Sequence, residues 1–242
     1  MSKSKKKSNK KSGKKKSQSG AHTPAPTPFQ PCQIYLLTPP HIHDVNAFAQ
    51  ELDAVLNAAP IACLQIRLKD TPEQEIVDIS GVLIPICHAH GTMVLINDDP
   101  KIAAQTGADG VHLGQSDMDI KLAKEVLSPD AVIGVTCHNS RELAFKACSD
   151  GADYVAFGAC FEGTTKPDAE LADLEIFTWW HEAIEIPCVA IGGVSPDNAQ
   201  AVIAAGADFI ALSSGVWDHA DGPVEAVTRL HALCAQHSPL LP

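Results

Sequence analysis

From residue 33 onward, short apolar runs alternate with stretches whose apolar residues recur at helical spacing, and this alternation repeats eight times. Short apolar runs are typical of buried strands, whereas apolar residues at i, i+3, i+4 and i+7 are typical of helices that bury one face. The runs expected to form strands are residues 33–37, 63–69, 92–96, 110–113, 131–136, 153–157, 187–191 and 209–212. Eight such units in about 210 residues predict an α/β fold, a single (β/α)8 TIM barrel, with a doubly wound open sheet as the alternative.

The segments between these runs carry helix patterns and helix start signals. Helical spacing predicts helices near residues 45–56, 102–105, 119–127, 171–183 and 224–233. Thr71, Pro72 and Gln74 predict a capping box at the second helix, Asn139 is expected to cap the fifth, and the seventh is expected to start at residues 195–196. Three Gly-Ala-Asp triplets, beginning at Gly107, Gly151 and Gly206, each predict a helix end that turns into the next strand.

The first 31 residues differ in composition from the rest of the chain. Residues 1–20 hold nine lysines and no acidic residue, and a Thr/Pro-rich stretch follows. Because such a segment buries too little apolar area to offset its ordering entropy, residues 1–31 are predicted to be a disordered tail and residues 32–238 a single catalytic barrel domain. A solvating role for the tail is expected, with weak, salt-sensitive and non-specific contact to nucleic acid as the alternative.

The cysteine pattern and the hydropathy limit where the chain acts. Eight cysteines are scattered singly, without metal-type spacing, and this favours a reducing, cytoplasmic compartment. No run of 18 apolar residues is present, so neither a membrane-spanning helix nor a membrane partner is expected. The basic start is not followed by the apolar segment that a signal peptide requires.

The run at residues 63–69 is polar at every second position. Because side chains alternate between the faces of a strand, Gln65, Arg67 and Lys69 are expected to point the same way, and the apolar residues between them the other way. Outside residues 1–20, the chain holds nine Lys and Arg residues against 29 Asp and Glu residues. Two scarce cations on one strand face, next to an amide, therefore predict an anion-binding site.

Further polar residues follow the carboxyl ends of the expected strands, where barrels of this kind carry their active sites. They are Asn97, Asp98, Asp99, His112, Gln115, Asp117, Thr136, His138, residues 162–166, Gly192, Gly193, Ser213 and Ser214. The two loops at residues 192–193 and 213–214 favour phosphate binding through backbone N–H groups, with plain tight turns as the alternative.

Three sets of side chains suggest more specific chemistry. Asp98 and Asp117 fit one Mg²⁺ ion, which takes one or two carboxylates together with substrate phosphates, although Asp98 or Asp99 could instead cap a helix before Pro100. Arg67, Lys69 and Lys166 can surround a diphosphate. Together with the second phosphate site at residues 192–193 and 213–214, they suggest that two phosphorylated substrates meet. His112 is expected to be a hydrogen-bonded core histidine more often than a base, whereas His138 lies past a strand end and is the better candidate for ligand contact. No P-loop and no serine nucleophile elbow is present in the sequence.

These stretches closely resemble the thiamine phosphate synthase family. The resemblance rests on residues 65–69 (QIRLK), 95–98 (LIND), 107–117 (GADGVHLGQSD), 134–138 (GVTCH), 164–166 (TTK) and 190–193 (AIGG), within residues 33–220. It implies a Mg-dependent transferase of thiamine biosynthesis. Such an enzyme joins 4-amino-5-hydroxymethyl-2-methylpyrimidine diphosphate to a thiazole phosphate and releases diphosphate by a dissociative substitution.

The resemblance also implies a role for each matching residue. Gln65 and Thr136 would hold the pyrimidine, and Asp98 and Asp117 would bind the single Mg²⁺ ion. Arg67, Lys69, Asn97 and Lys166 would bind the diphosphate, with Arg67, Lys69 and Lys166 acting as the catalytic cations. The thiazole phosphate would be held by Thr165, Gly193, Ser213 and Ser214.

The sequence departs from the family pattern at a few positions. Glu162 and Gly163 stand where the family usually has threonine and proline, Thr136 replaces a more usual serine, and residues 38–41 differ from the common turn. Gly163 removes a hydroxyl expected near the thiazole. Two alternatives follow: a thiazole tautomerase, which is an isomerase on the same barrel, and a non-catalytic thiamine-phosphate-binding protein. The sequence leaves a homo-oligomer open.

Overall fold

A computed structural model describes residue 1 and residues 31–162 and 171–239. Eight parallel strands form a closed barrel in the order of the sequence, and β8 pairs with β1. The strands are β1 (Gln33–Leu37), β2 (Ile61–Ile66), β3 (Met93–Asn97), β4 (Gly110–Leu113), β5 (Val132–His138), β6 (Tyr154–Phe157), β7 (Cys188–Ile191) and β8 (Phe209–Leu212). The predicted (β/α)8 barrel is confirmed, and the alternative of an open sheet is wrong because the ring closes.

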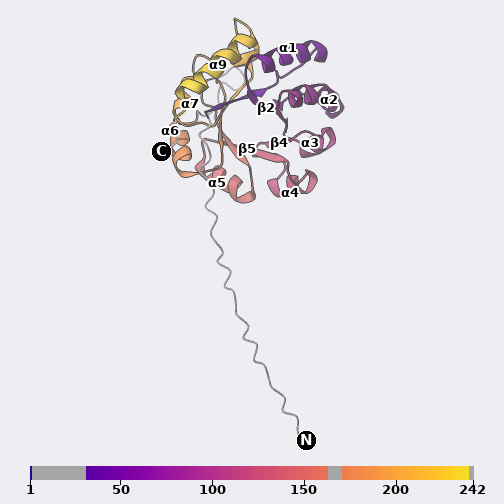
Figure 1. Cartoon of the computed structure of the whole chain (residues 1–242), viewed down its shortest axis with the longest axis vertical. Helices are drawn as coiled ribbons and strands as arrows, with labels where there is room; N and C mark the ends of the chain where they lie inside the picture. The colour runs from indigo at the N-terminus through magenta and orange to yellow at the C-terminus, as the bar shows by residue number, and fades with distance from the viewer. Residues whose placement is uncertain (2–30, 163–170, 240–242) are drawn as a thin grey trace.

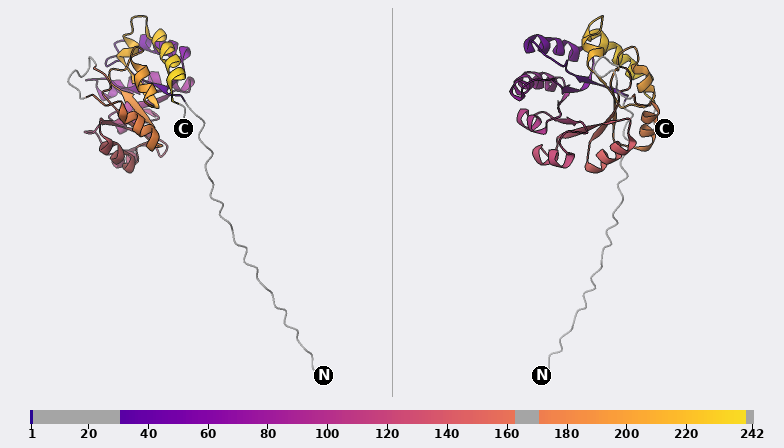
Figure 2. Two further views of the ribbon diagram at one scale, coloured as in Figure 1. Left: turned by 90° about the vertical axis from the view of Figure 1, so that its left-hand side faces the viewer. Right: turned by 180° about the vertical axis from the view of Figure 1, so that it is seen from behind.

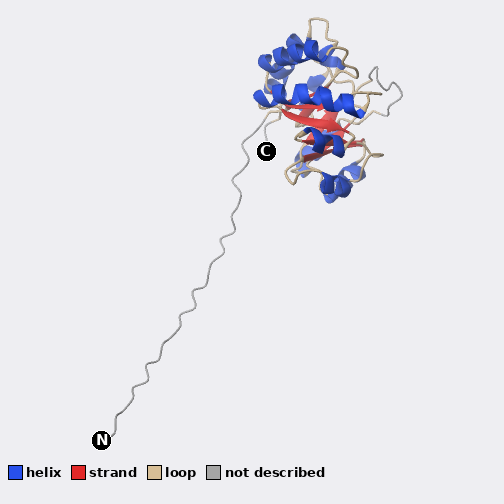
Figure 3. Ribbon diagram, turned by 90° about the vertical axis from the view of Figure 1, so that its right-hand side faces the viewer, coloured by secondary structure: helices blue, strands red, loops and turns tan. Residues whose placement is uncertain are grey.

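Helices surround this ring (Figure 1). They are α1 (Val45–Ala58), α2 (Glu73–Ala89), α3 (Pro100–Thr106), α4 (Ile120–Val126), α5 (Arg141–Asp150), α6 (Glu175–Ala183), α7 (Ala199–Ala204), α8 (Ser214–Trp217) and α9 (Pro223–His237). The view from behind shows the same outer layer, and colouring by secondary structure shows the strands enclosed by it (Figures 2 and 3). The short helix α8 was not predicted, because four residues are too few to display a helical period.

Some predicted helix starts are wrong. The helix α2 begins without a side-chain cap, and the Thr71 hydroxyl donates to a backbone carbonyl two residues earlier, so no capping box with Gln74 forms. Ser140, rather than Asn139, caps α5. The helix α7 begins at Ala199, because residues 195–198 first form a turn closed by a side-chain amide.

The strands face two separate cores. One lies between the sheet and the helices and contains the largest buried side chains, among them Trp180 and Phe177. The other fills the barrel and consists of Tyr35, Leu37, Cys63, Leu95, Tyr154, Ala156, Val189 and Ala211. Two of these interior residues are tyrosines, whose buried hydroxyl groups require hydrogen-bond partners. The barrel interior is therefore partly polar.

The three Gly-Ala-Asp triplets build the same device at the amino end of the barrel. Their glycines have φ angles of +70°, +97° and +102°, a left-handed conformation that glycine adopts without steric cost. The aspartates that follow, Asp109, Asp153 and Asp208, each accept a hydrogen bond from a backbone N–H of the preceding strand, at 2.7–2.8 Å. The triplets therefore end a helix and also fasten the start of one strand to its neighbour.

The predicted tail, residues 1–31, lies outside the described residues except for its two ends. Its boundary with a catalytic domain at residue 32 stays a prediction. Within the part of the chain that the structure describes, no helix is long and apolar enough to cross a membrane.

Candidate active site at the carboxyl end of the barrel

The strand β2 is shorter than predicted and ends at Ile66, so Arg67 and Lys69 lie in the loop that follows it. Gln65 does point into the barrel, where it is 1% exposed, and its apolar neighbours Leu64 and Ile66 pack outward. The strand ends because the backbone N–H of Arg67 donates to the Thr38 hydroxyl at 2.9 Å rather than to a neighbouring strand. The two cations are thereby placed above the barrel instead of on a strand face.

Thr38 joins three strand ends at this mouth of the barrel. Its hydroxyl donates to the Arg67 carbonyl at 3.1 Å, and its backbone N–H donates to the Gln65 carbonyl at 3.0 Å. The Ser213 hydroxyl, at the end of β8, donates to the Thr38 carbonyl at 2.9 Å. Because Thr38 is only 2% exposed, these bonds form a shielded clamp between the loops after β1, β2 and β8. The unusual turn at residues 38–41 is visible in the sequence, but this role of Thr38 is not.

A chain of hydrogen bonds runs through the barrel interior to the mouth. Gln65 Nε2 donates to the Tyr35 hydroxyl at 2.8 Å, and the hydroxyls of Tyr35 and Tyr154 are 2.9 Å apart. His112 Nδ1 lies 2.7 Å from the Tyr154 hydroxyl, and its Nε2 lies 2.7 Å from the Thr136 hydroxyl. Gln65 and Thr136, which the resemblance assigns to one substrate, are thus the two ends of a single network.

His112 is neutral in this network. Burial lowers its pKa to about 4, against a smaller raising effect of Asp117 and together with a lowering effect of Arg67. Both ring nitrogens have a hydroxyl partner, so the interpretation of His112 as a hydrogen-bonded core histidine is supported over that of a base. His138, by contrast, is exposed and has a φ of +52° at the end of β5.

The two tyrosines were missed by the sequence analysis, although one signal for them was available. Gly134 lies between His112 and Tyr154 in the register of β4, β5 and β6. A Cβ added at Gly134 would overlap the ring of Tyr154. A glycine inside a strand often marks such a close approach, so Gly134 indicates a large side chain crossing the barrel at this level.

Two carboxyl groups face each other beside this network. Burial, followed by a hydrogen bond and repulsion from Asp117, raises the pKa of Asp98 to about 6, although Arg67 acts to lower it. Asp98 also has a φ of +67°, a conformation that aspartate tolerates better than most residues and that is found often at functional sites. Asp99, rather than Asp98, caps α3, so the capping alternative for Asp98 is wrong.

The two carboxyl groups of Asp98 and Asp117 are not a complete metal site by themselves. Among the described residues, no group of three or more His, Cys, Asp or Glu side chains could hold a metal ion. One carboxylate oxygen of Asp117 accepts a hydrogen bond from the backbone N–H of Gly114, at 2.6 Å, and the same carboxyl group also approaches Asp98. Two converging carboxyl groups that disfavour simultaneous ionisation fit a divalent cation whose remaining ligands are water and substrate oxygens.

The cations of the mouth have no carboxylate partner among the described residues. Arg67 and Lys69 make no ion pair there, whereas Lys121 and Lys146 both pair with Asp150. Of the other residues in the predicted set, Asn97 lies at the end of β3 and hydrogen-bonds to the Asp98 carboxyl group. Thr165 and Lys166, together with Gly163, lie outside the described residues.

The predicted phosphate loops lie side by side. Gly193 has a φ of +67°, and an added Cβ would lie 2.5 Å from the carbonyl oxygen of Phe161, so the segment that leads to residues 163–170 crosses directly over it. Gly215 in α8 is equally close to the Val194 carbonyl. The Ser213 hydroxyl hydrogen is already committed to Thr38, so this side chain can only accept further hydrogen bonds.

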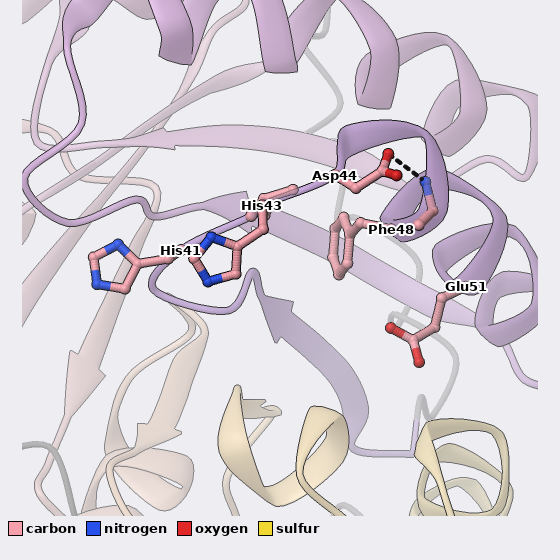
Figure 4. A pocket seen from close by; sticks show the side chains of 7 residues that line it. His41, His43, Asp44, Phe48 and Glu51 are labelled. Carbon is pink, nitrogen blue, oxygen red and sulfur yellow. Dashed lines mark hydrogen bonds between the residues drawn. The ribbon is translucent and has the colours of Figure 1, made fainter.

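A pocket of about 320 Å³ lies at the start of α1. It is lined by His41, Ile42, His43, Asp44, Ala47, Phe48 and Glu51, none of which belongs to the predicted set. The labelled side chains do not converge on one point in it, and the Asp44 carboxylate is used to cap its own helix (Figure 4). Its shape alone therefore does not identify it as the reaction site.

Comparison with known proteins adds an independent line of information. The family model described as thiamine monophosphate synthase matches residues 34–216. A thiamine-phosphate synthase of Rhodospirillum centenum is 49% identical over 81% of this chain and 94% of its own length, and one of Hyphomonas neptunium is 47% identical over 83% and 93%. The solved structure of a thiamine phosphate pyrophosphorylase from Pyrococcus furiosus is 30% identical with a TM-score of 0.75, covering 84% of this chain and 96% of that one.

Proposed function

The chain belongs to the thiamine monophosphate synthase family and is a transferase of thiamine biosynthesis, and from this premise we propose how the mouth of its barrel performs the reaction. The substrates would be 4-amino-5-hydroxymethyl-2-methylpyrimidine diphosphate and a thiazole phosphate. The catalytic domain would be residues 32–238. The observation that carries the proposal is that Arg67, which makes no ion pair in the described part of the chain, lies close enough to the facing carboxyl groups of Asp98 and Asp117 to lower the pKa of Asp98.

The pyrimidine would rest on the floor of the mouth between Gln65 and Thr136. Both side chains keep hydrogen-bonding capacity there. Among the described residues, nothing donates to the Gln65 side-chain oxygen, and the Thr136 hydroxyl is only half-buried. The diphosphate would then lie above, beside Arg67, Lys69, Asn97 and Lys166.

The bond between the pyrimidine methylene carbon and the diphosphate oxygen would break first. Its electron pair leaves with the diphosphate, and the thiazole nitrogen then captures the carbon cation with its lone pair. Fixed cations stabilise the charge that develops on the leaving oxygen, by about 4 kcal/mol for one pair at about 4 Å and an effective dielectric constant near 20. No general base is needed in this step, which agrees with a neutral His112 that is engaged on both ring nitrogens.

A Mg²⁺ ion held by Asp98 and Asp117 would neutralise part of the diphosphate charge. With a pKa of about 6, Asp98 would have to release its proton before binding the ion. The thiazole phosphate would bind across Thr165, Gly193, Ser213 and Ser214, mainly through backbone N–H groups because the Ser213 hydroxyl donates to Thr38. Holding both substrates in one mouth would supply much of the remaining acceleration.

Incubation of the full chain with both substrates and Mg²⁺ tests this function. Thiamine phosphate and one equivalent of diphosphate are the expected products, and chelation of Mg²⁺ should stop their formation. Isomerisation of the thiazole phosphate alone would instead indicate a tautomerase. Tight binding of thiamine phosphate without turnover would indicate the non-catalytic binding protein.

A further inference from the structure

The series of hydrogen bonds inside the barrel runs in one direction. This direction is set by which of the participating groups can donate a hydrogen and which can accept one. We infer that Tyr35, Tyr154 and His112 are positioning residues, which hold the Thr136 hydroxyl as a hydrogen-bond donor and the Gln65 oxygen as an acceptor toward the mouth. This inference deepens the proposed function and rests on it for the identity of the pyrimidine substrate. The distances along the chain, all between 2.7 and 2.9 Å, carry it.

The direction is set at Gln65. Its Nε2 can only donate, so the Tyr35 oxygen accepts from it at 2.8 Å. Tyr35 then has one hydroxyl hydrogen to give. The Tyr154 hydroxyl lies 2.9 Å away, and the Cys63 thiol beside Tyr35 is the weaker acceptor. Tyr35 therefore donates to Tyr154. The opposite direction would leave the Tyr35 hydroxyl hydrogen with only the Cys63 sulfur, a weak acceptor, instead of an oxygen.

The same argument continues through the histidine. Tyr154, having accepted from Tyr35, donates its own hydrogen to His112 Nδ1 at 2.7 Å. A neutral imidazole that accepts at Nδ1 carries its proton on Nε2, so His112 donates to the Thr136 oxygen at 2.7 Å. Thr136 is left with a hydroxyl hydrogen that no described residue accepts, and this hydrogen can be donated to a ligand.

The two ends of the chain now differ in polarity. The floor of the mouth offers one donor from Thr136 and one acceptor from the Gln65 oxygen. An aminopyrimidine edge has the complementary pair, because its amino group donates and the neighbouring ring nitrogen accepts. The interior chain would thus select the orientation of the pyrimidine without touching it.

The barrel is built to accommodate this chain. His112, Gly134 and Tyr154 are neighbours across β4, β5 and β6, and the missing side chain at Gly134 leaves space for the Tyr154 ring. The rings of His112 and Tyr154 stack with centroids 5.6 Å apart. A β-bulge follows between Thr136 and His138, and bulges commonly re-aim side chains next to active sites.

The spectroscopic test uses the full chain with ¹⁵N-labelled histidine. The His112 signals are identified by their absence in His112→Gln. Neutral His112 with its proton on Nε2 and a hydrogen-bonded Nδ1 is expected, and the Nδ1 signal should move toward its unbonded position in Tyr154→Phe but not in the matched variant Tyr35→Phe. A proton on Nδ1 in the parent protein would overturn the inference, because the hydrogen bonds would then run in the opposite direction, from His112 through Tyr154 to Tyr35.

The binding test uses calorimetric titration with the pyrimidine diphosphate and Mg²⁺ in the absence of the thiazole. Tyr154→Phe and Thr136→Val are each expected to weaken binding about tenfold, the effect of one hydrogen bond. Because Tyr154 acts through Thr136, adding Tyr154→Phe to Thr136→Val should weaken binding by less than about twofold more. Independent, multiplying losses would overturn the inference.

The thiazole phosphate serves as the matched control in the same variants. Its dissociation constant should change by less than about twofold in Tyr154→Phe, and equal losses for both substrates would show a merely structural role and overturn the inference. A parent chain that binds no pyrimidine diphosphate would refute the proposed function instead. The histidine spectra would still decide the direction of the chain in that case.

Discussion

At the amino end of the barrel, Asp109, Asp153 and Asp208 each accept a backbone N–H of the neighbouring strand. At the carboxyl end, Asp98 and Asp117 face each other, and burial and mutual repulsion raise the pKa of Asp98 to about 6. The aspartates at the amino end are therefore stabilised by hydrogen bonds from the backbone, whereas the two aspartates at the carboxyl end repel each other. At the amino end the aspartates join neighbouring strands, whereas at the mouth the carboxyl groups can still bind a ligand.

Three of the described cations, all on outer helices, pair with carboxylates. Arg229 on α9 pairs with Asp197 at 2.8 Å, and Lys121 and Lys146 pair with Asp150. Arg67 and Lys69 at the mouth have no such partner among the described residues, and neither do Lys101, Lys124 and Arg141 on the helices. Arg67 differs from those three because its charge acts on both Asp98 and His112. A cation that acts on two perturbed titratable groups at once is typical of functional sites.

The largest expected effect comes from removing a mouth cation. Arg67→Ala should lower kcat/KM by about 10²- to 10³-fold, as expected when one group that stabilises leaving-group charge is lost. Its free energy of unfolding should change by less than about 0.5 kcal/mol, because no described ion pair is broken. Steady-state kinetics and urea unfolding measure the two effects.

Arg229→Ala is the matched control for this experiment. It removes an exposed ion pair, so it should change stability by less than about 1 kcal/mol and leave kcat/KM unchanged. Equal rate losses in Arg67→Ala and Arg229→Ala would contradict the division between the two sets of cations.

A pair of isosteric substitutions should separate the aspartates of the two ends. Asp153→Asn replaces a charged acceptor of the Ile133 N–H by a neutral one, and it should destabilise the protein by about 1 kcal/mol with unchanged turnover. Asp98→Asn removes repulsion from Asp117 and should stabilise the chain by about 1 kcal/mol at pH 7.5, after allowance for solvent screening.

Asp98→Asn should at the same time abolish most of the Mg-dependent turnover. Thermal unfolding and product formation, measured on the same preparations, check the expected gain in stability and the expected loss of turnover. If Asp98→Asn were less stable than Asp153→Asn, the proposed repulsion between Asp98 and Asp117 would be wrong.

Most of the fold could be predicted from the sequence, because the alternation of apolar runs and helical spacing fixes eight units and the triplets mark three of the turns. Details decided by side-chain hydrogen bonds were missed. The strand β2, which begins at Ile61, stops at Ile66 because the hydroxyl of Thr38, in the loop after β1, accepts the hydrogen bond of the Arg67 N–H. A pattern of residue types does not contain that long-range contact.

For the site, the sequence predicted the residues at the mouth better than those beneath it. Arg67, Asp98, Asp117 and Thr136 stand at strand ends, where polar residues are conspicuous. Tyr35 and Tyr154 lie inside apolar strands and read as ordinary core residues, so only the structure connects them to His112. The roles assigned to all of these mouth residues, and to Thr165 and Lys166, stay predictions.

The raised pKa of Asp98 should also make stability depend on pH. Because the folded-state pKa of about 6 lies above the value of about 3.9 in the unfolded chain, the folded state binds the proton more strongly. The free energy of unfolding should therefore fall as pH rises from about 4 to about 6, and this contribution should be absent in Asp98→Asn. Urea unfolding of both proteins at several pH values measures the difference, and parallel curves would contradict it.

The smallest effect is expected from the lysine-rich segment. The described chain enters the barrel at its amino end, where Gln33 begins β1 and its N–H bonds to the Asp208 carbonyl, so the segment before it is joined to the barrel at the end opposite the mouth. Deleting residues 1–25 should therefore change kcat/KM by less than about twofold at 0.15 M salt, where charges further apart than about 8 Å are largely screened. Repeating the assay at low salt sharpens the test, since a loss confined to low salt would indicate long-range attraction of the anionic substrates. A large loss at both salt concentrations would mean that the segment takes part in folding or in the site itself.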